Sequence, residues 1–166
     1  MLEYRSLWLS APTTAWPPGV PRTGRWLRHV LVADTRDPAG HVAVAPSRWW
    51  PWPASRRVAI YEGPDASLLF TAKRVGWLSP VTVVAEADGN VVALIYGRTV
   101  ASAARRFLAR RAGVAGWQAG SFVNRSGADL VRWEAEGAGT VAHFNDELRN
   151  EPFVKMGLLA AILMHG

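Results

Sequence analysis

Arginine is the residue type in this sequence with the clearest capacity for chemistry. Guanidinium groups are planar, permanently charged and suited to bidentate contact with phosphate or carboxylate. Six arginines occur as three adjacent pairs in two short basic stretches: Arg56, Arg57, Arg105, Arg106, Arg110 and Arg111. We interpret these six residues as the candidate set for binding lipid headgroups or other anions.

A tryptophan-rich stretch, RWWPWP, precedes the first basic pair and begins at Arg48. It contains Trp49, Trp50 and Trp52, interleaved with prolines. Indole rings pack well against apolar surface, and they also favour the interface between membrane and water. The stretch therefore has two interpretations. It either plugs or covers part of the fold, or it forms an aromatic patch for a ligand, a membrane or a protein partner.

Catalytic and metal-binding patterns are missing from the sequence. It contains no cysteine, no GxSxG elbow, no GxxxxGK[ST] phosphate loop and no GxGxxG before a helix. The four histidines do not have the spacing that places two ligands on one metal: His29, His41, His143 and His165. Asp129, Glu134 and Glu136 near Trp133 read as an ordinary solvated edge. We expect no catalytic residue, no metal and no cofactor.

Length and composition indicate one globular domain over residues 1–166. The chain has 166 residues, of which 49% are hydrophobic and 19% charged, and its formal net charge is +6. This basic charge alone does not identify a partner. The opening MLEYRSLWLSAPTTAW lacks the pattern of a secretory leader, and no stretch is long enough to span a bilayer. We expect a cytoplasmic protein that can associate with membranes peripherally.

Most of the chain has the pattern of β-hairpins. Residues 12–21 are rich in proline and predict an extended strap. Short β-branched and aromatic runs follow, separated by turn residues, and Asp88-Gly89 predicts a tight turn with positive φ at both positions. The paired runs are 26–34 with 41–45, 58–61 with 67–74, 81–87 with 91–96, and 120–124 with 130–134, and residues 141–144 would add one more strand.

Two segments depart from this pattern. Residues 101–112, ASAARRFLARRA, contain good helix formers before Gly113 and predict a short helix with its arginines on one broad face. Residues 153–164, FVKMGLLAAILM, have almost no polar face, which predicts a helix buried on all sides within the strands. Gly157 and its alanines would let strands approach closely. Lys155 should lie near the mouth with its amine in water.

The sequence VTVVAEADGNVVALIYG, together with the terminal NEPFVKMGLLAAILM, resembles the tubby C-terminal-like superfamily. This superfamily includes tubby domains, phospholipid scramblases and LURP-one-related proteins. The resemblance is clearest over residues 81–166 and extends less clearly over residues 25–80. It implies a mainly β fold, a closed antiparallel barrel of about twelve strands around a central hydrophobic helix.

The region before the terminal helix differs from the scramblase pattern, which is rich in aspartate and associated with calcium. Here it reads AHFNDELRNEP, and only Asp146, Glu147 and Glu151 could supply oxygen ligands. We interpret these residues as caps for the start of the helix.

These observations favour a non-enzymatic domain that binds anionic phospholipid headgroups, including phosphoinositide, at a membrane surface. The alternative is a structural or protein-docking module that uses Trp49, Trp50 and Trp52. Nucleic-acid binding ranks lower, because no recognition helix or RNP pattern accompanies the charge. A small-molecule or enzymatic role is disfavoured because the terminal helix would fill the barrel.

Overall fold

The computed structural model describes residues 4–10, 28–33, 38–45, 57–62, 67–76, 78–113 and 119–165. The proline-rich strap 12–21, the stretch RWWPWP with its three tryptophans, and Arg56 lie outside the described residues. The interpretations placed on them remain predictions.

The described ranges contain twelve strands, one short 3₁₀ helix and one α-helix. The strands are β1 (Ser6–Ser10), β2 (Arg28–Ala33), β3 (Pro38–Ala45), β4 (Arg57–Glu62), β5 (Ser67–Val75), β6 (Val81–Glu86), β7 (Val91–Tyr96), β8 (Thr99–Ser102), β9 (Phe107–Ala112), β10 (Ala119–Val123), β11 (Asp129–Glu136) and β12 (Gly139–Phe144). The helices are η1 (Asp146–Leu148) and α1 (Pro152–His165).

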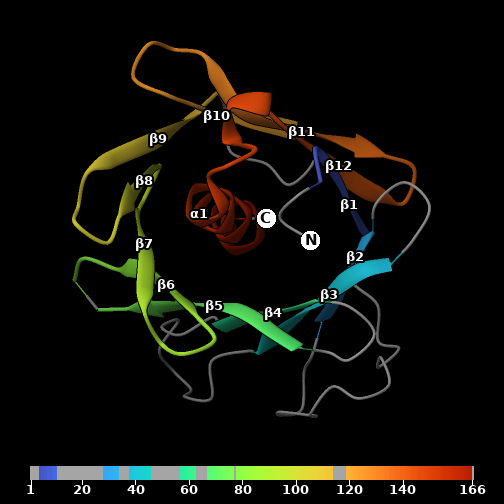
Figure 1. Ribbon diagram of the computed structural model, residues 1–166, viewed down its shortest axis with the longest axis horizontal. Coiled ribbons are helices and arrows are strands. Elements are labelled where there is room, and N and C mark those ends of the chain that lie inside the picture. Colours follow the sequence, from blue (N-terminus) through green and yellow to red (C-terminus); the bar gives the residue numbers. More distant parts are fainter. Residues whose placement is uncertain are drawn as a thin grey trace.

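The strands form an antiparallel sheet that curves around α1 (Figure 1). From β2 onward, each strand pairs with the next one along the chain. Strand β1 pairs with β12 over five residues and with β2 through Trp8–Ala33 and Leu9–Val32. We call this curved sheet the barrel. The predicted mainly β fold with a C-terminal helix is confirmed, and β1 is a strand that the sequence analysis missed.

Alternation of side chains places the core inside the barrel. Leu7 and Leu9 on β1 are buried, as are Val58 and Ile60 on β4, while their neighbours are more exposed. Successive side chains of a strand point to opposite faces, so one set faces α1 and the other faces outward. This period of two is the signal that predicted the hairpins.

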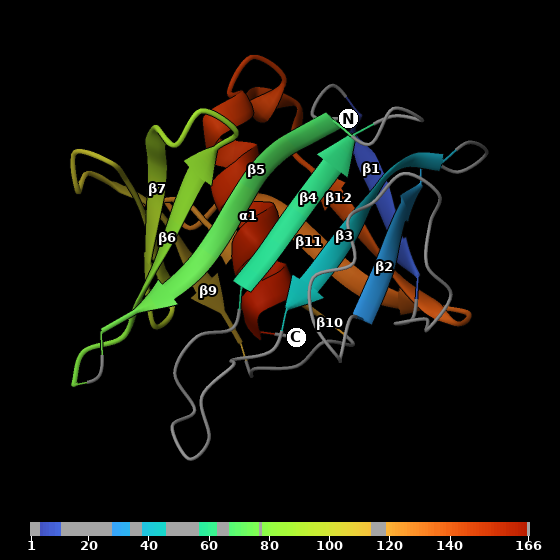
Figure 2. The same cartoon turned by 90° about the horizontal axis from the view of Figure 1, so that it is seen from below.

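Helix α1 fills the barrel. Figure 2 shows it running between the strand walls, and its residues Leu158 to Leu163 are buried. Gly157 lies against the wall, because a Cβ built on it would be 2.9 Å from Cβ of Ala93 and 3.2 Å from Val100. The predicted central helix and the close approach at Gly157 are confirmed.

The predicted helix over residues 101–112 is wrong. This segment is a hairpin, in which β8 ends at Ser102 and β9 begins at Phe107. In β9, Ala109 and Arg111 are buried while Arg110 is exposed, which is the alternation of a strand. Alanine and arginine are good helix formers, but intrinsic propensity is small in energy, and packing in the barrel overrides it.

Three hairpins share one type of three-residue loop. In each, the residue before the loop donates its N–H to the carbonyl oxygen four positions later: Glu86 to Asn90, Ser102 to Arg106, and Asn124 to Ala128. The last loop residue has positive φ, and it is Gly89, Gly127 or Arg105. Asp88 does not have the predicted positive φ, because the loop is longer than a two-residue turn.

Antiparallel pairing fixes the end of the barrel at which each connection lies. Connections that leave even-numbered strands lie at the end where α1 begins, and the chain enters β1 there. Connections that leave odd-numbered strands begin and finish at the opposite end, where α1 ends. Neighbours in this antiparallel order run in opposite directions, so residues far apart in the sequence gather at the same end.

Candidate functional site

The barrel does not bring the predicted arginines together on one face. Arg105 and Arg106 are exposed in the β8–β9 loop, at the end where α1 begins. Arg110 is exposed on β9, whereas Arg111 is only 6% exposed. Arg57 starts β4 at the opposite end of the barrel. The single broad face expected from a helix therefore does not form.

Arg111 takes part in the core. Its guanidinium carbon lies 5.2 Å from the ring centroid of Trp133, which is buried and also contacts Phe122. Gly120 provides the space for this indole, because a Cβ there would collide with the ring. Burial, and secondarily the charge of Arg98, lower the pKa of Arg111 from its usual value. Arg111 is thus unsuited to contact a surface ligand.

The two sets of connections differ in charge in the sequence. In the sequence, the connections that leave odd-numbered strands contain no Asp or Glu, and those that leave even-numbered strands, including the one before α1, contain seven. Each set contains five arginines. Seven of the nine tryptophans of the sequence also belong to the odd set. We call the end where α1 finishes the basic end and the end where it starts the acidic end.

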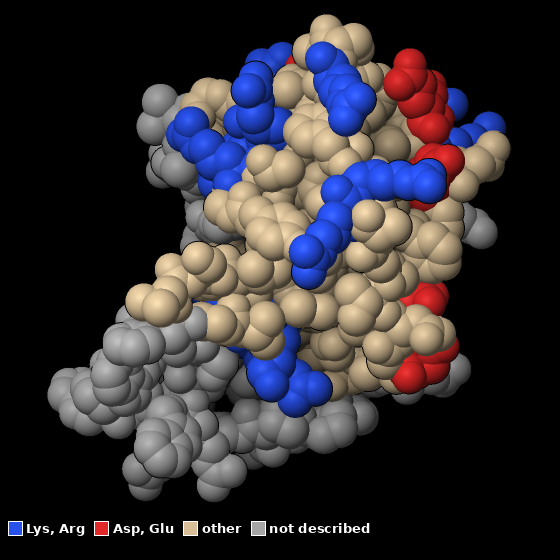
Figure 3. Space-filling model, turned by 90° about the vertical axis from the view of Figure 1, so that its left-hand side faces the viewer, with Lys and Arg blue, Asp and Glu red and all other residues tan. Residues whose placement is uncertain are grey.

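Figure 3 shows this division on the wall that includes β7, β8 and β9. Lys and Arg side chains surround an uncharged central area, and Asp and Glu side chains gather toward the edge where α1 begins. At the basic end of this wall, the register pairs Val75–Val81, Val81–Tyr96 and Tyr96–Thr99 form an uncharged outward row. Tyr96 and Val75 are both 38% exposed, so this row is available to solvent.

Four described cations line the basic end between β4 and β8: Arg57, Lys73, Arg74 and Arg98. Arg57 and Lys73 are register partners on β4 and β5, and both are exposed. Register partners point to the same face of a sheet, so the two positive charges are neighbours. Arg98 lies in the β7–β8 turn and donates a hydrogen bond to the carbonyl of Gly113 at 3.0 Å.

An exposed leucine lies beside these cations. Leu78 is 87% exposed in the β5–β6 connection, which projects beyond the neighbouring strands in Figure 2. The connection turns at Gly76, whose φ is +87° and whose missing side chain leaves room for the carbonyl of Ser79. Lys73, Arg74 and Leu78 were not among the predicted site residues. These residues could have been predicted from the sequence by assigning consecutive connections to alternate ends of the barrel.

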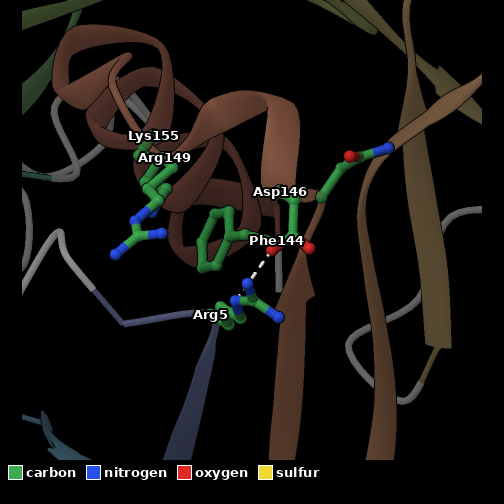
Figure 4. Close-up of a pocket in the computed structure, with 6 residues that line it drawn as sticks. Arg5, Phe144, Asp146, Arg149 and Lys155 are labelled. Carbon is green, nitrogen blue, oxygen red and sulfur yellow. Dashed lines mark ion pairs between the residues drawn. The ribbon is translucent and has the colours of Figure 1, made fainter.

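A pocket opens at the acidic end, where the chain passes from β12 into α1. Its volume is about 120 Å³, and Figure 4 shows most of its lining side chains: Arg5, Phe144, Asn145, Asp146, Arg149 and Lys155. Three of these side chains are cationic and one is a carboxylate. Nε of Arg5 lies 2.8 Å from Oδ1 of Asp146, and both side chains are mostly exposed. We call this cavity the mouth pocket.

Lys155 lies at the mouth, as predicted, but its expected exposure is wrong because the residue is only 2% exposed. Its Nζ lies 3.4 Å from the carbonyl oxygen of Tyr4, to which it donates, and 5.7 Å from the ring centroid of Phe144. The carbonyl and the ring face offer partial negative charge to the ammonium. The lysine is therefore accommodated within the wall of the pocket.

The residues before α1 cap η1 and pair with the segment before β1. Oδ1 of Asn145 accepts a hydrogen bond from the N–H of Glu147 at 3.0 Å and so caps η1. Asp146 pairs with Arg5, and the first turn of α1 contains no acidic residue. Of the three acidic residues expected to cap α1, Asp146 and Glu147 lie in the first turn of η1 instead. Glu151 directly precedes α1, and its carbonyl accepts a hydrogen bond from the N–H of Lys155 at 3.1 Å. Across the described part of the chain, no group of three or more His, Cys, Asp or Glu side chains could hold a metal ion.

The described helix is too short to cross a bilayer. Comparison of the chain with protein-family models, with curated proteins and with solved structures returned no match.

Proposed function

We propose that the chain is a non-enzymatic, tubby-like closed barrel whose basic end binds anionic phospholipid headgroups at a membrane surface. The observation that carries this proposal is the group of exposed cations at the basic end: Arg57, Lys73, Arg74 and Arg98. In the sequence, the connections of this end also contain no Asp or Glu, although Glu136 ends β11 there. A positive surface is attracted to the negative potential of an anionic leaflet.

The exposed cations supply the electrostatic part of the binding energy. Each Lys or Arg close to an anionic bilayer contributes about 1 kcal/mol. Arg57, Lys73 and Arg74 together would therefore increase affinity roughly 100-fold at low salt. Surface charges are screened within about 8–10 Å at physiological salt, so this binding should weaken as salt is added.

Leu78 supplies an apolar contribution. A leucine that is 87% exposed on a projecting connection gains free energy when it enters the interfacial region of a bilayer. Lys73 and Arg74 precede it near the end of β5 and would place their charged groups at the headgroup level. The tryptophans of the odd-numbered connections match the residue type that favours this interface.

Co-sedimentation with vesicles tests the proposal. Wild-type protein should pellet with phosphatidylcholine vesicles that contain phosphatidylserine, and it should remain in solution with pure phosphatidylcholine. The variant Arg57→Ala/Lys73→Ala/Arg74→Ala should lose most of this binding. The matched control is Arg105→Ala/Arg106→Ala/Arg125→Ala, which removes the same charge from exposed positions at the acidic end.

The control variant should bind nearly as well as the wild type, because its substitutions face away from the membrane. Equal losses in both variants would mean that net charge alone governs binding, and this would refute the assignment to the basic end. If folded wild-type protein does not pellet at low salt, the membrane proposal fails and a protein-docking role of the Trp-rich segment becomes the better hypothesis.

A further inference from the structure

The mouth pocket has a composition that the proposed membrane contact does not use. Arg5, Arg149 and Lys155 reach it from three places in the chain: the start of β1, the end of η1 and the first turns of α1. The pocket lies at the acidic end, so a bilayer against the basic end would not reach it. A ligand of this pocket would therefore be distinct from the bilayer.

Charge is the first argument for a ligand in this pocket. Cations that surround one small volume repel one another, and a low local dielectric strengthens that repulsion. Lys155 is almost fully buried, whereas Arg5 and Arg149 line the pocket from exposed positions. Among the described lining residues, Asp146 is the one carboxylate, and its pairing with Arg5 is exposed to solvent and so weakly held. The described lining side chains therefore comprise three cations and one anion.

Size and donor type are the second argument. A volume of about 120 Å³ holds a small tetrahedral oxyanion together with water, and it excludes a nucleotide. Two guanidinium groups and one ammonium group are donors without acceptor capacity, which suits a phosphate oxygen. Phe144 also lines the pocket, with its ring centroid 5.7 Å from Nζ of Lys155.

We propose that the mouth pocket binds the phosphate group of a small soluble phosphate compound through Arg5, Arg149 and Lys155. A phosphate monoester carries close to two negative charges at neutral pH and three strong acceptor oxygens. It would compensate the excess charge of the lining, and Arg5 can exchange its exposed contact with Asp146 for the ligand. Inorganic phosphate is the simplest probe of this chemistry.

Thermal unfolding in phosphate and in sodium chloride of matched ionic strength provides the test. At a phosphate concentration of about 100 Kd, the Tm of the wild type should rise by about 5–10 °C relative to chloride. Arg149→Ala and Lys155→Met should each lose most of this rise. Arg106→Ala, at the same end but outside the pocket, should keep it.

Lys155→Met keeps the length of the buried side chain and removes its charge, so it should fold and show an unchanged or higher Tm in chloride. The proposal is overturned if the wild type shows no phosphate-specific rise, or if the pocket variants keep the full rise. These measurements contain no vesicles, so their failure is distinct from failure of the membrane proposal.

A lipid could also present a phosphate monoester, and a second arm separates this source from a soluble one. Vesicles with phosphatidic acid should bind Lys155→Met as strongly as the wild type, because the pocket faces away from the bilayer. Loss of phosphatidic acid binding in Lys155→Met would contradict the assignment to a soluble ligand.

Discussion

Arg57 and Lys73 are direct register partners on adjacent antiparallel strands, and both side chains are exposed on the same face of the barrel. Like charges in this arrangement destabilise a sheet, in contrast to pairs of opposite charge. The like-charge pair therefore lowers the stability of the basic end at the position where that end would contact an anion. Stability and binding should respond in opposite directions when this pair is changed.

Lys73→Glu should stabilise the protein and weaken its binding to membranes. Replacing the like-charge pair by a pair of opposite charge should raise the free energy of unfolding by about 0.5–1 kcal/mol, measured by urea denaturation. Binding to vesicles with phosphatidylserine should fall by at least tenfold. Arg74→Glu is the matched control for stability, because it makes the same change in charge opposite Thr82. An equal gain in stability in both variants would argue against the pairwise repulsion.

Gly157→Val should destabilise the fold by about 1–3 kcal/mol. Even a Cβ at this position would lie 2.9 Å from Cβ of Ala93, so a larger side chain must push α1 away from β7. Denaturation of Gly157→Ala, Ala93→Gly and the double variant would measure the coupling. We expect Ala93→Gly to be better tolerated when position 157 is alanine, and additive effects would show that the two positions are not in tight contact.

Arg105→Gly should raise the free energy of unfolding by up to about 1 kcal/mol. Arg105 has a φ of 60°, a conformation that the equivalent loops assign to Gly89 and Gly127. The control Arg106→Gly should lower stability, because its φ is not positive and glycine only adds freedom to the unfolded chain. Chemical denaturation of the two variants gives the comparison. A loss of stability in Arg105→Gly would show that the arginine side chain matters more than the backbone strain.

Arg111→Met should leave stability unchanged or increase it. The lowered pKa of this base means that the unfolded chain binds its proton more tightly, so the charged residue opposes folding at every pH where it remains protonated. That cost is constant below the pKa of the folded state, begins to fall as the pH rises through it, and is gone only above the pKa of the unfolded state. Methionine keeps contact with Trp133 without the charge. A loss of more than about 2 kcal/mol in denaturation at neutral pH would indicate that the contact with the indole ring dominates.

The strands and α1 could be predicted because their burial follows simple periods. Val81 to Glu86 alternates between the two faces, and the uniformly apolar Leu158–Leu163 segment has no solvated face. Residues 107–112 were mispredicted because an inward position holds Arg111, which hides the period of two. Only the packing of this arginine on Trp133 shows that it faces the core.

The candidate site was harder to predict because it depends on topology. Arg57 was identified from its charge, but its neighbour Lys73 lies sixteen positions away and becomes a partner only through strand register. Lys155 was placed at the mouth correctly, whereas its burial depends on Tyr4 and Phe144, which reach it from β1 and β12. The difference in Asp and Glu content between the odd-numbered and even-numbered connections can be recognised only after consecutive connections are assigned to alternate ends of the barrel.

The most direct test of the central claim is which end of the barrel enters the membrane interface. The sequence contains no cysteine, so Ser79→Cys beside Leu78 and Ala104→Cys in the β8–β9 loop can each carry one environment-sensitive fluorophore. On addition of vesicles with phosphatidylserine, the probe at position 79 should shift to the blue and be quenched by nitroxide-labelled lipid. The probe at position 104 should remain in water. A shift at position 104 with none at position 79 would contradict the account, as would binding that leaves both probes unchanged.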